Sequence, residues 1–384
     1  MNVARTAAVV AIVAVEQTTL RQSGGSSDLA LVLALGAITA VIFVLTLIRY
    51  LVTRWALDGP TLRIETGLLR RDLRQLPLAR IQAVDVVRPF MARIFGLAEL
   101  RIRLAGSSSR SGGRLSYLSE PVALDLRARL LAGHHGLDQS TPAPAEQWLA
   151  AVAPGELIGS AVLSAAAALV VGWSGIAAGV LATSSSGTAT GVGATTLVLS
   201  LVGFGRNTWR RVAVMYGFRV GVAPDGIRIQ RGLLSTVSET VPLNRVQAVR
   251  KIEPLVWRLF GWCRLEVDVA GSPGDEASGR SSRVTKSLLP VGRHGVADTL
   301  LVSLLGLYQF PLSRPPRRVR WKAPLSYHFL GAGIHGPVVG ASGGRLRKVT
   351  AWVPLEKTQS VRRVQGPLQR ALRLESVHVD AAGR

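Results

Sequence analysis

The feature that most constrains this chain is a nine-residue phrase that occurs three times. It begins at Leu76, Val241 and Val353, and its second residue is always proline. The flanking glycines, ten residues before and 29 residues after that proline, are Gly67, Gly232, Gly344, Gly106, Gly271 and Gly383. Matching offsets at three places predict three copies of one folded module.

Each module has alternating apolar and charged residues on either side of the phrase. The alternation occupies residues 62–64 and 227–229 before it, and residues 100–104, 265–269 and 377–379 after it. A period of two predicts strands with one buried face, and the first glycine is expected to supply a positive φ in a turn. The modules are therefore expected to be all-β.

Helical segments are expected at two places in the modules. A short one should follow Pro89, Pro254 and Pro367, because proline favours the first turn of a helix. Apolar residues at helical spacing predict a closing helix at residues 120–132 and 294–307. The third module has no such segment, so we expect it to be incomplete.

Two long uncharged runs indicate membrane-spanning helices. Residues 29–48 contain no charge and are followed by Arg49, Tyr50, Arg54 and Trp55, a basic and aromatic flank typical of an interface. Residues 157–205 also contain no charge and are long enough for a hairpin of two helices. The expected fold class is therefore an integral membrane protein in which transmembrane α-helices alternate with all-β modules.

The expected organisation follows from these runs. The segments are 1–28 (an N-terminal segment with a partial helix), 29–53 (a transmembrane helix), 54–134 (the first module), 135–154 (a linker), 155–207 (a transmembrane hairpin), 208–309 (the second module) and 310–384 (the third module, incomplete). Arginine is dense in the modules and absent from the hairpin turn. The positive-inside rule therefore predicts a multi-pass plasma-membrane protein with cytoplasmic modules.

The formal net charge of +23 suits an anionic membrane surface or a nucleic acid. A coding bias toward arginine explains the excess equally well, because only five of the basic residues are lysine. Aromatic residues make up 5% of the chain, which is few for a protein that stacks on bases. We expect no nucleic-acid partner.

The sequence contains no recognisable catalytic or metal-binding set. Cys263 is the only cysteine, so an intrachain disulfide and a thiolate metal site are excluded, and the six histidines lack ligand spacing. The uncharged runs also lack the ionisable residues that a proton-coupled transporter would need. We therefore expect no enzyme activity and no cofactor.

The most distinctive polar residues recur inside the phrase. They are Arg80, Gln82, Arg245, Gln247, Lys357 and Gln359, and Arg70, Arg71 and Arg74 precede the first copy. One interpretation is that they satisfy backbone groups at a strand end. The other is a basic binding surface that faces lipid phosphate or a protein partner, where each arginine near an anionic leaflet could gain about 1 kcal/mol.

These motifs together resemble a known family. The phrases are Gly-Leu-Leu, then Pro-Leu-x-Arg-Ile/Val-Gln-Ala-Val, then Pro-x-x-x-Arg-Ile/Leu-Phe-Gly. They are similar to those of the membrane-flanked bacterial PH-like domain family, in particular its multi-copy members. The resemblance implies a bent, barrel-like antiparallel sheet closed by a C-terminal helix, alternating with transmembrane helices. It implies no catalytic residues.

The expected function is that of a membrane-anchored, non-enzymatic binding or scaffold protein. Its expected partners are the lipid bilayer, a protein or a second copy of the chain, and anionic lipid. The alternative is a component of a membrane transport complex or of an envelope-stress or antimicrobial-resistance complex.

Overall fold

The computed structural model describes residues 36, 54–59, 61–66, 72–104, 113–134, 147–164, 172–179, 183, 187–223, 226–269, 284–306 and 310–381. The chain divides into two compact units, Met1–Arg80 and Ile81–Arg384, and each unit is considered by itself.

The first unit contains a three-stranded antiparallel sheet in the order β1-β2-β3. Its strands are Arg54–Asp58, Thr61–Thr66 and Asp72–Pro77, and a 3-10 turn at Leu78–Arg80 follows them. Leu62 and Ile64 are buried on β2, so the strand predicted from their alternation is confirmed.

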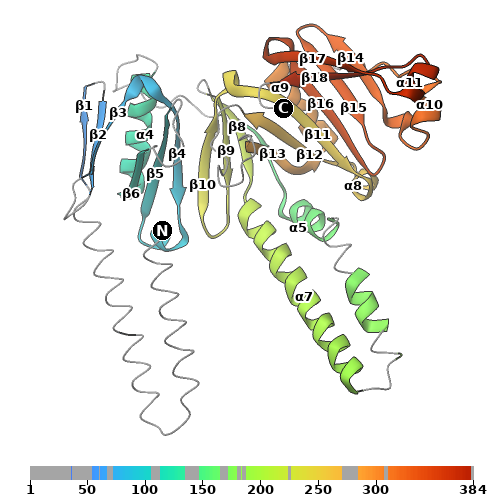
Figure 1. Cartoon of the computed structure of the whole chain (residues 1–384). Helices are drawn as coiled ribbons and strands as arrows, with labels where there is room; N and C mark the ends of the chain where they lie inside the picture. The colour runs from blue at the N-terminus through green and yellow to red at the C-terminus, as the bar shows by residue number, and fades with distance from the viewer. Residues whose placement is uncertain are drawn as a thin grey trace. The chain divides into compact units, whose positions relative to one another are not determined.

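The second unit contains a seven-stranded antiparallel sheet in the order β6-β5-β4-β10-β9-β8-β7 (Figure 1). Its strands are β4 Ile81–Arg88, β5 Leu97–Leu104, β6 Gly113–Ser119, β7 Gln147–Ala151, β8 Arg219–Ala223, β9 Gly226–Arg231 and β10 Thr236–Val241. Strands of the first and second modules therefore belong to one sheet.

The second unit also contains a six-stranded antiparallel sheet in the order β13-β12-β11-β16-β15-β14. A two-stranded sheet of β17 and β18 follows it in the chain. The strands are β11 Val246–Pro254, β12 Trp262–Val269, β13 Val284–Arg293, β14 Gly331–His335, β15 Val338–Gly343, β16 Arg347–Pro354, β17 Thr358–Val364 and β18 Ser376–Ala381. This sheet joins the second module to the third.

Helices occur where the sequence predicts them in the modules. The short helices are α3 Phe90–Ile94, α8 Leu255–Leu259 and α11 Pro367–Ala371, and the closing helices are α4 Glu120–His134 and α9 His294–Leu305. The remaining helices with described bounds are α5 Pro154–Val162, α7 Gly187–Met215 and α10 Val319–Lys322, with 3-10 turns at Leu243–Arg245, Tyr327–Phe329 and Leu355–Lys357.

The three modules share one strand register. Ile81 lies opposite Leu104, Val246 opposite Val269, and Thr358 opposite Ala381, at matching positions of the repeat. The register then shifts by one residue in all three modules, at Gln82, Gln247 and Gln359. The recurrent glutamine is therefore the extra residue of a β-bulge, which bends the strand at the same point each time.

The glycine before the phrase occupies a left-handed turn where the structure describes it. Gly232 has φ +116° and Gly344 has φ +94°, as the sequence predicted. A Cβ at either position would collide with a backbone carbonyl, of Ser235 or of Arg347. Gly67 lies outside the described residues.

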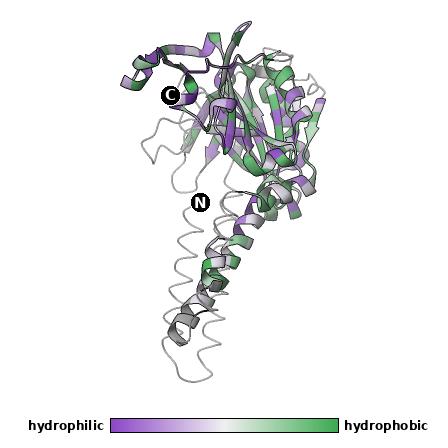
Figure 2. Ribbon diagram, turned by 90° about the vertical axis from the view of Figure 1, so that its right-hand side faces the viewer, coloured by the Kyte–Doolittle hydropathy of each residue, from purple (hydrophilic) through white to green (hydrophobic). Residues whose placement is uncertain are grey.

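The expectation of an integral membrane protein is wrong for the part of the chain that the structure describes, where no helix is both long and apolar enough to cross a bilayer. At 1.5 Å per residue, the nine residues of α5 extend about 14 Å, half of a hydrocarbon core. Figure 2 shows hydrophilic residues among the hydrophobic ones along α7, which contains Arg206 and Arg210. Apart from Gly36, residues 29–48 lie outside the described residues.

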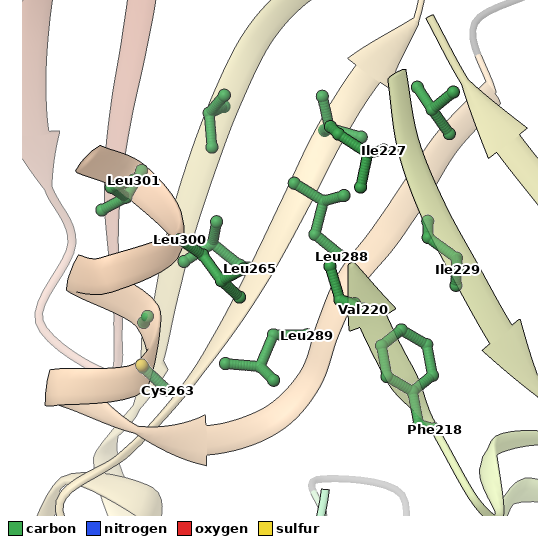
Figure 3. Packing of buried hydrophobic residues seen from close by; sticks show 14 of the residues in the cluster. Phe218, Val220, Ile227, Ile229, Cys263, Leu265, Leu288, Leu289, Leu300 and Leu301 are labelled. Atoms are coloured by element: carbon green, nitrogen blue, oxygen red, sulfur yellow. The ribbon is translucent and has the colours of Figure 1, made fainter. Parts of the chain in front are cut away.

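A continuous hydrophobic core of buried residues centres on the second module. Phe218, Ile229 and Leu265 are almost fully buried there, and Leu300 of α9 packs against the same cluster. Figure 3 shows how side chains from the strands and from α9 meet. Cys263, on β12, is buried beside this helix, so it packs as a small apolar residue.

Candidate functional site: module junctions and apolar tips

Two junctions join neighbouring modules strand to strand. At the first junction, β4 pairs antiparallel with β10, and Val86 lies opposite Ser238. At the second junction, β11 pairs with β16, and Lys251 lies opposite Thr350. These two residue pairs occupy matching positions of the repeat, so both junctions follow one register.

An arginine after the strand reinforces each junction. Arg93 Nη1 donates to the Leu233 carbonyl at 3.0 Å, and Arg258 Nη2 donates to the Arg345 carbonyl at 2.6 Å. Arg93 and Arg258 are equivalent in the repeat, and so are the two acceptors. The hydrogen bond is therefore a second feature that both junctions share.

A buried charged cluster lies at the first junction. Arg103 Nη2 is 2.5 Å from Asp85 Oδ2 and 2.6 Å from Glu239 Oε1, so one guanidinium bridges two carboxylates from different modules. Lys286 Nζ is 2.5 Å from Glu239 Oε1, and the Thr240 amide donates to Asp85 at 3.2 Å. Because charges are buried only when they are paired, this cluster holds the two modules in one register.

The pKa values of the two carboxylates in the cluster are shifted in opposite directions. Burial raises the pKa of Asp85 above its ordinary value, although Arg103 and Lys286 act against it. Burial also acts to raise the pKa of Glu239, but Lys286 and Arg103 outweigh it and hold that pKa at about 2. Glu239 is therefore ionised at neutral pH and pairs with both cations.

The second junction carries the same ion pair with its signs exchanged. Arg250 and Asp268 occupy the positions of Asp85 and Arg103, and they form an ion pair. Ala351 replaces Glu239 at the third position of the cluster. Lys348 Nζ instead approaches Glu253 Oε2 at 3.4 Å across this junction.

The residues of the predicted binding surface differ in their exposure. Arg74 and Arg80 are exposed in the first unit, Gln247 is buried and Gln359 is exposed. Arg70 and Arg71 lie outside the described residues, as does the side chain of Gln82.

Two of the recurrent basic residues have neighbours that the structure describes. Lys357 lies 3.1 Å from its neighbour Glu356. Burial and the nearby Arg103 lower the pKa of Arg245. Arg245 is thus the predicted site residue that lies near the charged cluster, whereas the others remain a predicted surface.

Sequence reasoning missed Asp85, Arg103, Glu239 and Lys286. Charges that alternate along a strand are typical of a solvent-facing side, so Arg101 and Arg103 looked equivalent. A signal was present in the repeat, where the aligned positions hold Asp85 with Arg103 and then Arg250 with Asp268. A pair that exchanges its signs between copies indicates contact between the two residues.

Each module also presents an exposed apolar tip around its short helix. The first tip consists of Phe90, Met91, Ile94 and Phe95, the second of Leu255, Val256, Leu259 and Phe260, and the third contains Leu368. Phe95 is 74% exposed and Leu259 is 83% exposed. Large apolar side chains that recur at one exposed place usually mark an interaction site.

No group of three metal-ligating side chains comes together among the described residues. Burial raises the pKa of Cys263 to about 12, so this thiol is a poor nucleophile at neutral pH.

Comparison with protein families identifies the repeated module. The family model for the bacterial PH domain matches residues 8–134, 160–293 and 295–384, which together cover most of the chain. No match was found among curated proteins or solved structures. Bacterial PH domains repeated along one chain support a binding or scaffold role, since PH domains are generally non-catalytic modules that bind lipids or proteins. The chain belongs to the bacterial PH domain family.

Proposed function

We propose that this chain is a non-enzymatic scaffold whose modules bind the surface of an anionic bilayer through their apolar tips. The observation that carries the proposal is the recurrence of exposed apolar residues at the same short helix, in a protein with a net charge of +23. Apolar side chains that enter the interface beside basic residues are the usual means by which proteins bind such surfaces. The anionic cytoplasmic face of the plasma membrane is the proposed location.

The energetics of the tips favour binding by several modules at once. Removing a Phe or Leu side chain from water contributes about 1.5–3 kcal/mol, so one side chain alone gives weak binding. The strand pairing at the junctions connects the modules that carry the tips. A second tip then binds at a high effective concentration, which raises the overall affinity.

Co-sedimentation with vesicles tests the proposal. The full chain should bind phosphatidylcholine vesicles that contain phosphatidylserine, and it should bind pure phosphatidylcholine much less. Phe95→Ser and Leu259→Ser should each weaken binding about tenfold or more, from the loss of 1.5–3 kcal/mol of apolar transfer. Both side chains are largely exposed, so the fold should tolerate the substitutions.

Leu325→Ser is the matched control, because Leu325 is 67% exposed but belongs to none of the tips. It should leave vesicle binding unchanged. Equal binding by the wild type and both tip variants would overturn the proposal. In that case, loss of a cross-linked protein in the tip variants would assign the tips to a protein partner.

Membership of a transport complex or of an envelope-stress complex stays a prediction. No described residue distinguishes it from other scaffold roles.

A further inference from the structure

Two strand edges that correspond to the two sides of a junction take part in neither observed junction. At each junction, the first strand after the phrase pairs with the strand before the phrase of the next module. By this rule, β17 of the third module and β3 of the first module remain. β3 pairs with β2, and β17 pairs with β18. The other edge of each of these two strands pairs with no described strand.

We propose that β17 of one chain pairs with β3 of a second copy of the same chain, in the register of the observed junctions. Arg250 opposite Ala351 and Lys251 opposite Thr350 transfer, through the repeat, to Arg362 opposite Arg74 and Arg363 opposite Leu73. The pairing joins the chains head to tail. It goes beyond the proposed membrane role and does not depend on it.

The charges at the transferred positions invert those of the first junction. In the first junction, the cation Arg103 lies between the anions Asp85 and Glu239. At the equivalent positions of the proposed pairing, Asp380 replaces Arg103, Arg362 replaces Asp85, and Arg74 replaces Glu239. The anion Asp380 would therefore lie between two cations. Arg362 and Arg74 would repel each other directly across the strands, and Asp380 compensates them as Arg103 compensates its two carboxylates.

The sign pattern also makes the pairing selective. If β3 displaced β10 from β4, Arg74 would meet the cation Arg103 beside Asp85. A pairing with β17 gives Arg74 the anion Asp380 instead. Like charges placed together at an interface disfavour a wrong partner, so the inverted cluster favours the head-to-tail pairing.

The third module also keeps the arginine that reinforces both observed junctions. Arg370 is equivalent to Arg93 and Arg258, each of which donates to a backbone carbonyl of the next module. Arg370 thus supplies the donor for the same hydrogen bond to a second chain. Unpaired strand edges tend to recruit another strand, and here the side chains favour one partner and one register.

Disulfide trapping between two chains tests the register. One tagged full-length chain carries Leu73→Cys, and a differently tagged chain carries Arg363→Cys. Both side chains are well exposed. Directly opposite Cα atoms lie about 4.5–5.5 Å apart, within reach of a disulfide. The buried Cys263 should not compete.

The expected result is a mixed disulfide between the two chains, formed faster than with the control pair Leu73→Cys and Val361→Cys. Val361 lies two residues before Arg363 on β17 and, in the proposed register, opposite Gln75. No mixed disulfide, or equal rates for the two pairs, would overturn the proposal. A chain that carries both Leu73→Cys and Arg363→Cys should form disulfides between chains. Formation of only the disulfide within one chain would also overturn the proposal.

Charge exchange provides a second test by analytical ultracentrifugation of the full chain. Arg74→Glu should weaken self-association at least about tenfold, since an ion pair becomes a repulsion. The combination of Arg74→Glu, Arg362→Asp and Asp380→Arg reproduces the signs of the first junction and should restore association. Circular dichroism checks the fold of each variant. A folded Arg74→Glu variant that associates like the wild type, or a folded triple variant that fails to recover, would overturn the proposal.

Discussion

Removal of the guanidinium at the first junction should destabilise the protein far more than removal of a neighbouring one. Arg103→Met keeps the apolar stem of the side chain but leaves Asp85 without its ion-pair partner. The Asp85 side chain is 4% exposed, so water cannot replace the lost partner. Breaking a buried ion pair costs about 3–5 kcal/mol, and Lys286 still compensates Glu239, so we expect a loss of about 3 kcal/mol.

Arg101→Met is the matched control on the same strand. Arg101 Nε lies 2.6 Å from Glu99, but its side chain is 50% exposed, and Glu99 also has Arg114 at 2.6 Å. An exposed ion pair contributes about 0–1 kcal/mol, so little stability should be lost. Urea denaturation followed by circular dichroism measures both variants. Equal losses in Arg103→Met and Arg101→Met would refute the view that the cluster holds the modules together.

The backbone at Gly232, the charge of Glu239 and the core packing of Leu265 each give a testable prediction. Gly232→Ala should destabilise the protein by more than about 1 kcal/mol because φ is +116°, whereas Gly295→Ala, on helix α9 with open space around it, should be neutral or stabilising in thermal unfolding. The pKa of Glu239 is lowered from its ordinary value of 4.5 to about 2, so the stability that this carboxylate contributes is present above pH 4.5 and is lost as the pH falls toward 2. Glu239→Gln should flatten that part of the stability–pH profile, and an unchanged profile would contradict this prediction. Leu265→Ala should cost about 2–5 kcal/mol in urea unfolding, whereas the exposed Leu243→Ala should cost less than about 0.5 kcal/mol.

The sequence was sufficient to predict the local structure of the modules. The strands around Ile102, Val267 and Val379 follow from alternation, and the short helices follow from proline with apolar spacing. These features depend on residues close together in the chain, so one copy of the repeat specifies them. The family resemblance also proved correct. The proposed domain boundaries remain predictions.

The pairing of modules could not be predicted in the same way. A strand such as β10 has the same alternating pattern whether its second edge pairs with β4 or faces solvent, because backbone hydrogen bonds leave no mark on the sequence. Glu239 likewise resembles a solvent-facing residue until Arg103 is placed beside it. The recurrent glutamine lies near a basic residue in each copy of the phrase, but its position is explained by the β-bulge.

For the described residues, the membrane-spanning prediction failed because it relied on the absence of charge over a long run. The run after residue 157 is uncharged, yet α5 ends at Val162 after nine residues. Glycine and threonine, which are frequent at the start of α7, lower its apolar character without adding charge. Absence of charge is therefore a weaker criterion than continuous apolar length.

The proposed role at an anionic bilayer is tested most directly by an environment-sensitive probe on a tip. Phe95→Cys labelled with bimane places the probe at a 74% exposed position, and the buried Cys263, whose pKa is raised to about 12, should stay unlabelled. On addition of phosphatidylserine-containing vesicles to the full chain, the emission should shift to the blue, and pure phosphatidylcholine should cause little change. An emission spectrum that stays the same with both kinds of vesicle would contradict the account.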